Sequence, residues 1–178
     1  EKQKEIRRLT NGLALSDIQF LKSIGHIDII APFIKSRTNI LIKDFASQVD
    51  VFGITPDYME TVNFNLKSGR YLSDLDNLNF NKVCVIEENI ITESGNKVLI
   101  GDFITIDQEF FMIVGILKSK DLKDEGSEIK DIQSINKRIY IPLNSSSRYI
   151  SRSMLDPEID GIILKVDDVN FLKEVATK

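Results

Sequence analysis

The chain of 178 residues contains a single cysteine, Cys84, and a single histidine, His26. One cysteine cannot form an internal disulfide, so cysteine usage indicates no cellular compartment. One histidine and one cysteine are also too few for a Cys/His zinc site, an HExxH metal site or a Ser-His-Asp triad. We therefore expect His26 to be an ordinary residue at the start of a strand, and Cys84 to be a buried, inert thiol.

Sequence signatures of several other sites are missing as well. Neither G-x-G-x-x-G nor G-x-x-x-x-G-K-[ST] occurs, so we expect no nucleotide cofactor and no ATP hydrolysis by the chain itself. Residues 121–131 lack the regularly spaced oxygen ligands and the glycine of an EF-hand loop, and no metal site is expected. The net charge of -4 offers nucleic acid no general attraction. No stretch approaches the ~20 apolar residues that a membrane-spanning helix needs.

The composition that is present is that of a globular protein. Hydrophobic residues make up 42% of the chain and charged residues 28%, a balance that distinguishes it from disordered proteins. A chain of this length can bury a substantial core without a disulfide or a metal. The length predicts one domain or two small interlocked ones.

One stretch in the first half of the chain changes character several times. Residues 49–52 alternate like a strand, which stops at Gly53. Thr55 can cap the helix that follows, and Pro56 suits its first position. We expect the apolar side of this helix to be formed by Tyr58, Met59, Val62 and Phe64. The helix should end in the polar run at residues 65–68.

The remaining patterns predict further short elements. Strands are expected over residues 26–35, 38–43, 82–86, 102–106, 109–117, 138–143 and 161–166. Helices or helical turns are expected over residues 16–25, 87–93 and 144–153, and from 169 onward. Ser36-Arg37 would separate the first two strands, Asp107-Gln108 would form a hairpin turn, and Asn144 would cap a helix. The charge-rich residues 118–137 predict a solvated, mobile excursion.

Large apolar residues of these strands are expected to share one core. They are Val85, Ile86, Phe103, Phe111, Ile113, Val114 and Ile141. The continuous apolar run at residues 82–86 is typical of a strand that is buried on both faces. Burial of each such side chain contributes ~1.5 to 3 kcal/mol to stability.

Neighbouring carboxylates are the remaining candidates for acid-base chemistry, because two carboxyl groups in different environments can act as acid and base. By spacing alone, the candidate pairs are Glu87 with Glu88, Asp74 with Asp76, and Asp124 with Glu125. Asp74 and Asp76 are expected on the same side of an extended segment, where Arg70 could pair with one of them. We favour a structural ion pair that fixes the turn at Gly69 and Arg70 over a catalytic site.

The order of these features resembles the MacB-like periplasmic core domain of ABC-transporter permeases of the MacB/FtsX type. Those domains share the pattern (V/I)xGVxPxYF…LxxGRxF…D, a Val-rich strand, a strand pair ending in V-G-V/I-L, and a later Ile-Pro. The resemblance covers residues 13–166, and the chain matches the pattern at Gly53, Pro56, Tyr58, Leu66, Gly69, Arg70, Asp76, Val83 to Ile86, Gly101, Val114, Gly115, Ile116, Leu117, Ile141 and Pro142. We expect structural roles for Gly53, Pro56, Tyr58, Gly69, Arg70, Asp76, Gly115 and Pro142.

Both the element order and the resemblance predict an α+β fold. Pieces that combine a helix and a strand lie at the two ends of the chain, on either side of a mostly β middle. The resemblance implies a discontinuous porter-like α/β subdomain from residues 13–35 and 161–178, which should be incomplete here. A β-rich part, residues 36–160, would be inserted into it, and residues 1–12 would be a linker.

The function that the resemblance implies is that of a non-catalytic domain on the periplasmic or extracellular side of the cell membrane. Such domains couple ATP hydrolysis inside the cell to efflux, lipoprotein transport or envelope signalling. The implied partners are an ABC ATPase, a second permease subunit, a periplasmic adaptor or carrier protein, and the membrane through flanking helices. Two alternatives stay open: a small hydrolase that uses an acidic pair, and a solute-binding module with a cleft between its two parts.

Overall fold

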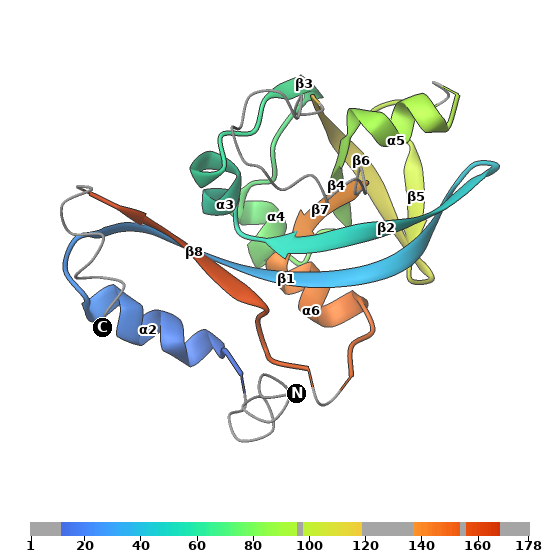
Figure 1. The fold of residues 1–178 in the computed structure, drawn as a ribbon. Coiled ribbons are helices and arrows are strands. Elements are labelled where there is room, and N and C mark those ends of the chain that lie inside the picture. The colour runs from blue at the N-terminus through green and yellow to red at the C-terminus, as the bar shows by residue number, and fades with distance from the viewer. Residues whose placement is uncertain (1–11, 96–97, 119–136, 154–155, 168–178) are drawn as a thin grey trace, which may run out of the picture.

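The computed structural model describes residues 12–95, 98–118, 137–153 and 156–167 (Figure 1). Its helices are α2 (Leu15–Ser23), α3 (Pro56–Thr61), α4 (Asp74–Leu78), α5 (Glu88–Glu93) and α6 (Leu143–Tyr149). Its strands are β1 (Ile27–Ile42), β2 (Phe45–Ile54), β3 (Leu66–Gly69), β4 (Val83–Glu87), β5 (Phe103–Ile106), β6 (Glu109–Leu117), β7 (Arg138–Pro142) and β8 (Gly161–Val166). The fold is α+β, with one mixed sheet and short helices around it.

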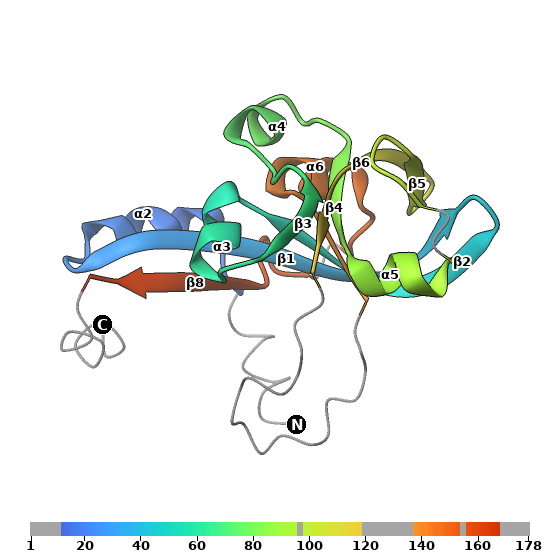
Figure 2. The ribbon, with the colours of Figure 1, turned by 90° about the horizontal axis from the view of Figure 1, so that it is seen from above.

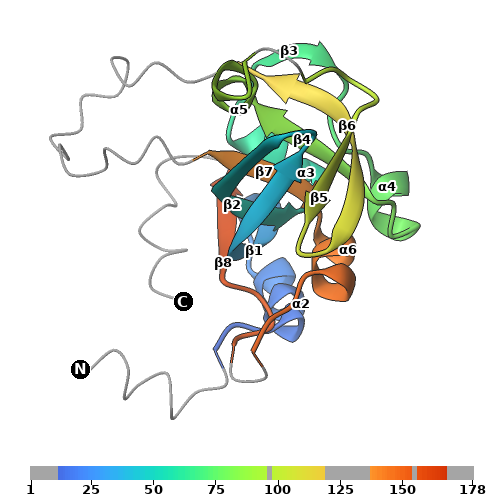
Figure 3. The same ribbon diagram turned by 90° about the vertical axis from the view of Figure 1, so that its right-hand side faces the viewer.

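Six of the eight strands close into a ring (Figure 3). The strand order is β2-β7-β4-β6-β5-β1, and β1 pairs with β2, so the last strand returns to the first. The β2–β7 and β4–β6 pairs are parallel, and the other pairs of the ring are antiparallel. β8 pairs with the first half of β1, and β3 pairs with the end of β6. Closure gives each ring strand a neighbour on both sides, which protects strand edges from unwanted pairing.

The interior of this closed sheet is the main core. Side chains along a strand alternate between its two faces, so every second residue points inward. The buried strand residues of this cluster are Ile40, Ile42, Val49, Val51, Cys84, Ile86, Ile104, Ile106, Phe111, Ile113, Ile116, Ile139 and Ile141. The thiol of Cys84 is thus enclosed among aliphatic side chains, as the sequence predicts.

A second apolar cluster covers the outer face of β2, β7, β4 and β6. Its buried members on these four strands are Phe52, Ile54, Val83, Val85, Val114, Leu117 and Tyr140, and Ala31 of β1 belongs to it as well. Tyr58 and Met59 of α3 pack into the same cluster. The prediction of a single core is therefore wrong, because Val85 and Val114 face this outer layer. Phe103 is also wrongly placed in the core: it is 60% exposed, since the alternation that turns Ile104 inward turns Phe103 outward.

β1 differs from the sequence prediction, whereas the β5–β6 hairpin agrees with its own prediction. The connection expected at Ser36-Arg37 is wrong, because β1 runs through it and pairs Ser36 with Val51 and Arg37 with Asp50. These ladder contacts satisfy the backbone groups of two polar residues whose composition had indicated a break. Between β5 and β6, Asp107 and Gln108 have φ angles of 48° and 72°, as a two-residue hairpin turn requires.

Two helix boundaries also differ from the predictions. α3 ends at Thr61, not in the polar run at residues 65–68, where β3 pairs with β6 instead. α6 begins at Leu143 and ends at Tyr149, so Asn144 lies inside the helix and does not cap it. Short polar segments are ambiguous because a strand contact from a distant part of the chain can decide their conformation.

Elements from both ends of the described chain lie together (Figures 1 and 2). β8 runs antiparallel to the first half of β1, with Ala31 opposite Ile163, and α2 lies against the same part of β1. Lys165 of β8 forms an ion pair with Asp28 of β1, with 3.3 Å between Nζ and Oδ2. Because β1 then continues into the closed sheet, one strand belongs to both groups of elements.

Within the described ranges, no helix is long and apolar enough to cross a membrane. Two predictions fall mainly outside those ranges: the excursion at 118–137 and the helix from 169 concern residues 119–136 and 168–178.

Candidate functional site

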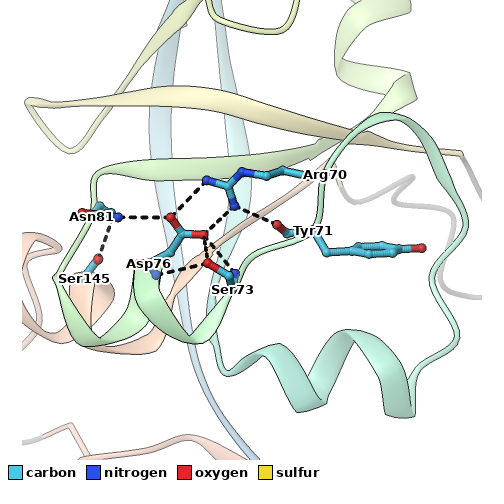
Figure 4. Close-up of polar contacts among 6 residues, drawn as sticks. All are labelled: Arg70, Tyr71, Ser73, Asp76, Asn81 and Ser145. Atoms are coloured by element: carbon cyan, nitrogen blue, oxygen red, sulfur yellow. Dashed lines mark hydrogen bonds and ion pairs between the residues drawn. The ribbon is translucent and has the colours of Figure 1, made fainter.

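The polar residues of the predicted motif meet between β3 and α4 (Figure 4). Arg70 donates two hydrogen bonds to the carboxylate of Asp76, from Nη1 to Oδ2 at 2.6 Å and from Nη2 to Oδ1 at 3.1 Å. The backbone N–H and the hydroxyl of Ser73 donate to Asp76 at 2.9 and 2.8 Å, and the Asn81 amide donates at 3.1 Å. We call Arg70, Ser73, Asp76 and Asn81 the Arg70 network. The ion pair that the sequence predicted for Arg70 is present.

The carboxylate at the centre of the Arg70 network is almost fully enclosed. The side chain of Asp76 is 3% exposed, whereas that of Arg70 is 50% exposed. Burial alone would raise the pKa of Asp76, but the hydrogen bonds from Arg70, Ser73 and Asn81 outweigh it and hold this pKa well below its ordinary range. The hydrogen bond to Asp76 in turn raises the pKa of Arg70. A carboxylate so firmly ionised acts as a structural anchor and has no proton to donate.

The position of Asp76 also defines α4. Ser73 is the N-cap residue, and its Oγ accepts from the Asp76 N–H at 3.3 Å, while the Asp76 carboxylate accepts from the Ser73 N–H. This reciprocal arrangement is a capping box. The extended segment expected around Asp74 and Asp76 is therefore wrong, because both residues lie in a helix. The Ser-x-x-Asp spacing is a sequence signal for this helix start, and it went unused in the prediction.

Two motif glycines make the approach of β3 to β6 possible. Gly69 lies opposite Gly115 in the β3–β6 ladder. A Cβ on Gly69 would lie 2.2 Å from the Val114 carbonyl oxygen, and a Cβ on Gly115 would lie 2.2 Å from the Arg70 carbonyl oxygen. The φ of Gly69 is +82°, which a side chain would strain. The close contact lets the Arg70 N–H donate to the Val114 carbonyl at 2.9 Å.

Hydrogen bonds also fasten α4 to α6. Asn77 accepts the backbone N–H of Asn144 through its side-chain oxygen at 2.9 Å, and the Asn144 amide group through its carbonyl at 3.0 Å. The hydroxyl of Ser145 donates to the Asn81 carbonyl at 2.9 Å. Asn77, Asn81 and Ser145 hold this junction together. The sequence did not reveal them, because side-chain contacts between distant segments leave no local pattern.

Gly53 and Pro142 join β2 and β7 to α6. Gly53 lies beside Ile141 in the parallel β2–β7 ladder, and the next pair is Ile54 with Pro142. A Cβ on Gly53 would lie 2.3 Å from the Cβ of Ser146 in α6. The missing side chain therefore lets α6 pack directly on β2, and Pro142 ends β7 where α6 begins.

Pro56 and Tyr58 position α3 on the outer cluster. Pro56 is the first residue of α3, where its fixed φ suits the helix and its missing N–H costs no hydrogen bond. The Tyr58 ring is surrounded by other aromatic rings, with centroid distances of 5.8, 6.3 and 6.5 Å to Phe33, Phe64 and Tyr140. These two motif residues therefore serve packing.

Glu87 and Glu88 bond to different partners. Glu87 accepts a hydrogen bond from the Tyr140 hydroxyl at 3.3 Å, whereas Glu88 forms an ion pair with Lys67. Burial raises the pKa of Glu87, and the nearby positive charge of Arg138 opposes this. The two carboxylates thus have separate partners in different environments.

The structure does not bring the other described candidate residues together in one site either. Asp76 belongs to the Arg70 network while Asp74 is exposed, and Asp124 and Glu125 lie outside the described ranges. Burial raises the pKa of the Cys84 thiol, which keeps it protonated. His26 precedes β1 with a φ of 71°. Among the residues that the structure describes, no cluster of three His, Cys, Asp or Glu side chains could hold a metal ion.

A shallow groove of about 460 Å³ lies between α2, the first half of β1 and α3. Seven of its eleven lining residues are apolar, and its polar residues are Lys22, Asp28, Thr55 and Asp57. Asp28 is already paired with Lys165. None of the residues that line the groove belongs to the Arg70 network or to the acidic pairs named above.

The fold is shared with transporter domains that lie outside the cytoplasm. It is similar to the extracellular domain of the noncanonic ABC-type transporter YknZ from Gram-positive bacteria, with a TM-score of 0.73 and 16% identity over 93% of this chain and 79% of that one. It is also similar to the periplasmic region of MacB from Actinobacillus actinomycetemcomitans, with a TM-score of 0.73 and 20% identity over 93% and 71%. No curated protein sequence matches the chain.

Residues 3–178 match the model of the MacB-like periplasmic core domain. The chain belongs to this family, which the ordered motif of the sequence had indicated.

Proposed function

We propose that the chain is a non-catalytic extracytoplasmic domain of an ABC-transporter permease. It would be held at the cell membrane by helices outside this sequence, and it would couple cytoplasmic ATP hydrolysis to efflux, lipoprotein transport or envelope signalling. The observation that carries the proposal is that the polar motif residues of this family are engaged in internal bonds. Arg70 and Asp76 neutralise each other, so they are committed to the fold instead of a substrate.

A coupling role is supported by the continuity of the sheet. β1 pairs with β8 over its first half and with β2 over its second half, so a displacement of the chain-end elements would act directly on the closed sheet. We propose that residues 13–35 and 161–178 form the porter-like part, that residues 36–160 form the β-rich part, and that residues 1–12 are a linker.

The partners in this proposal are an ABC ATPase subunit or domain, a second permease subunit, and a periplasmic adaptor or carrier protein. Their contact surface would include exposed groups of the β-rich part and its adjoining loops, because the porter-like part is committed to the membrane-proximal connection. Recognition would depend on protein surfaces, since the domain needs no cofactor for this role.

Deletion of residues 13–166 from the parent membrane protein tests the proposal. Transport or signalling should be lost in cells, whereas the purified complex should retain basal ATP hydrolysis, because the deleted region contains none of the ATPase groups. Persistent transport would contradict the coupling role. Hydrolase activity of the purified chain that disappears on Glu87→Gln or Asp74→Asn would overturn the non-catalytic assignment.

A further inference from the structure

The short helix α4 presents large apolar side chains to solvent. Leu75 and Leu78 are each 66% exposed, and their spacing of three places them on one side of the helix. Figures 2 and 3 both place α4 at the periphery of the molecule. Contiguous exposed apolar residues, unlike ones scattered singly, are a feature of protein or membrane interaction sites.

The support beneath these leucines is rigid. The Arg70 network fixes the start of α4 through a buried ion pair and a capping box. Asn77, between the two leucines, is bonded to Asn144 of α6. A surface held in this way loses little conformational entropy when a partner binds.

Carboxylates border the exposed leucines. Asp74 begins α4, and Asp57 and Glu60 lie on the exposed side of α3. Burial raises the pKa of Asp57, the negative charges of Asp74 and Glu60 raise it further, and Lys22 of α2 opposes this. The start of α4 also lies near α3, because Leu72, two residues before α4, packs in the same apolar cluster as Tyr58 and Met59. The field of the three carboxylates favours a cationic partner and disfavours an anionic lipid surface.

We propose that Leu75 and Leu78, together with Asp57, Glu60 and Asp74, form a docking surface for a cationic amphipathic helix of a partner protein. We call these five residues the α4 patch. The proposal rests on the proposed function, because a coupling domain acts through protein contacts.

A second apolar surface on the β5–β6 hairpin provides the control. Phe103 and Phe110 are 60% and 64% exposed, and their positions in the ladder place them near each other on the outer face. The ion pairs Lys43–Asp102 and Lys82–Glu109 lie beside them. Because each ion pair is neutral overall, this surface should favour neither a cationic nor an anionic partner.

A titration of the 178-residue chain with two synthetic helical peptides tests the docking surface. The peptides share one pattern of leucines, and their polar positions are all lysine in one and all glutamate in the other. The Leu/Lys peptide should shift the amide NMR signals of α3 and α4 and weaken with added salt, and the Leu/Glu peptide should bind at least about tenfold more weakly. Equal binding of the two peptides, or shifts confined to β5 and β6, would overturn the proposal.

Matched variants assign the binding to the α4 patch. The double variant Leu75→Ser/Leu78→Ser and the triple variant Asp57→Asn/Glu60→Gln/Asp74→Asn should each lose binding of the Leu/Lys peptide. The variant Phe103→Ser/Phe110→Ser should keep it. All substituted side chains are exposed. If Leu75→Ser/Leu78→Ser lowers the melting temperature of the chain, the triple variant of the carboxylates still tests the docking surface. Binding of the chain to phosphatidylglycerol vesicles that Leu75→Ser/Leu78→Ser abolishes would overturn the proposal in favour of a membrane contact.

The full-length permease separates this proposal from the proposed function. Leu75→Ser/Leu78→Ser should reduce transport or signalling several-fold while ATP hydrolysis continues. If deletion of residues 13–166 abolishes the output but the double variant leaves it intact, the docking surface is wrong and the coupling role stands. If neither change affects the output, both proposals are wrong.

Discussion

Asp76 shows, at the scale of single residues, what a buried carboxylate requires. An ionised group inside a protein is tolerated only where a countercharge and hydrogen bonds replace water. Arg70 supplies the charge, and Ser73 and Asn81 supply further donors. Removal of one partner leaves a charge enclosed without compensation, which costs more than the intact pair contributes.

Arg70→Ala should therefore lower the free energy of unfolding by about 2–4 kcal/mol, with some of the loss recovered because the arginine site is half exposed to water. For a chain of this size the melting temperature should fall by about 5–15 °C. Arg70→Lys keeps the charge but loses the bidentate hydrogen bond, so its melting temperature should lie between those of Arg70→Ala and the wild type. An unchanged melting temperature for Arg70→Ala would contradict a structural role.

Asp76 should also make stability depend on pH. Its folded-state pKa is lowered, so the ionised carboxylate stabilises the fold at neutral pH. This contribution should disappear as the pH falls from the ordinary aspartate pKa of about 4 toward the lower folded-state value. Urea unfolding at several pH values should show Asp76→Asn much less stable than wild type at pH 7, with the gap narrowing in strong acid. A gap that is constant with pH would exclude this explanation.

At the scale of elements, agreement with the sequence depends on how local the determining contacts are. The β5–β6 hairpin was predicted because alternation and turn residues lie within one short stretch. β3 and α4 were missed because each is short, and their pairing with β6 and α6 depends on residues far along the chain. The Ser73-x-x-Asp76 capping signal would have identified α4, whereas no local signal marks β3.

The antiparallel pairing of β3 with β6 should be sensitive to one added methyl group at the point where Gly69 faces Gly115. Gly115→Ala places a Cβ where the Arg70 carbonyl oxygen lies, so β3 must shift and the Arg70 network must distort. We expect a loss of roughly 2 kcal/mol or more in chemical denaturation. Gly25→Ala is the matched control, because no atom lies within 4 Å of the added Cβ, and it should change stability little. Equal effects of the two substitutions would argue against a close backbone contact between β6 and the end of β3.

The two faces of the hairpin should respond very differently to the same truncation. Phe111 is fully buried inside the closed sheet and Phe103 is mostly exposed. Phe111→Ala should cost about 3–5 kcal/mol, including the cavity it leaves. Phe103→Ala should stay within about 0.5 kcal/mol of wild type in the same urea titration. Comparable losses for both would mean that the strand faces are assigned incorrectly.

At the scale of the whole molecule, the α+β class and the family follow from the ordered motif, but ring closure does not. Strand partners such as residues 50–54 and 138–142 lie far apart in sequence, and no local pattern states which strands meet. The division of apolar residues into an interior and an outer cluster depends on that closure. For the same reason, an ion pair of Arg70 with Asp74 or Asp76 could be predicted from spacing, whereas the choice of Asp76 and the links to Asn81 and to α6 could not.

The uninterrupted course of β1 has a mechanical consequence. Sixteen residues in extended conformation span roughly 50 Å at about 3.3 Å per residue. Tension applied along this strand would be carried by its covalent bonds. The ten positions at which it pairs with β2 would then be loaded together in shear and would not open one after another. A pull at Ile27 would therefore reach Ile42 along a single strand that is paired with β2 from Phe33 onward.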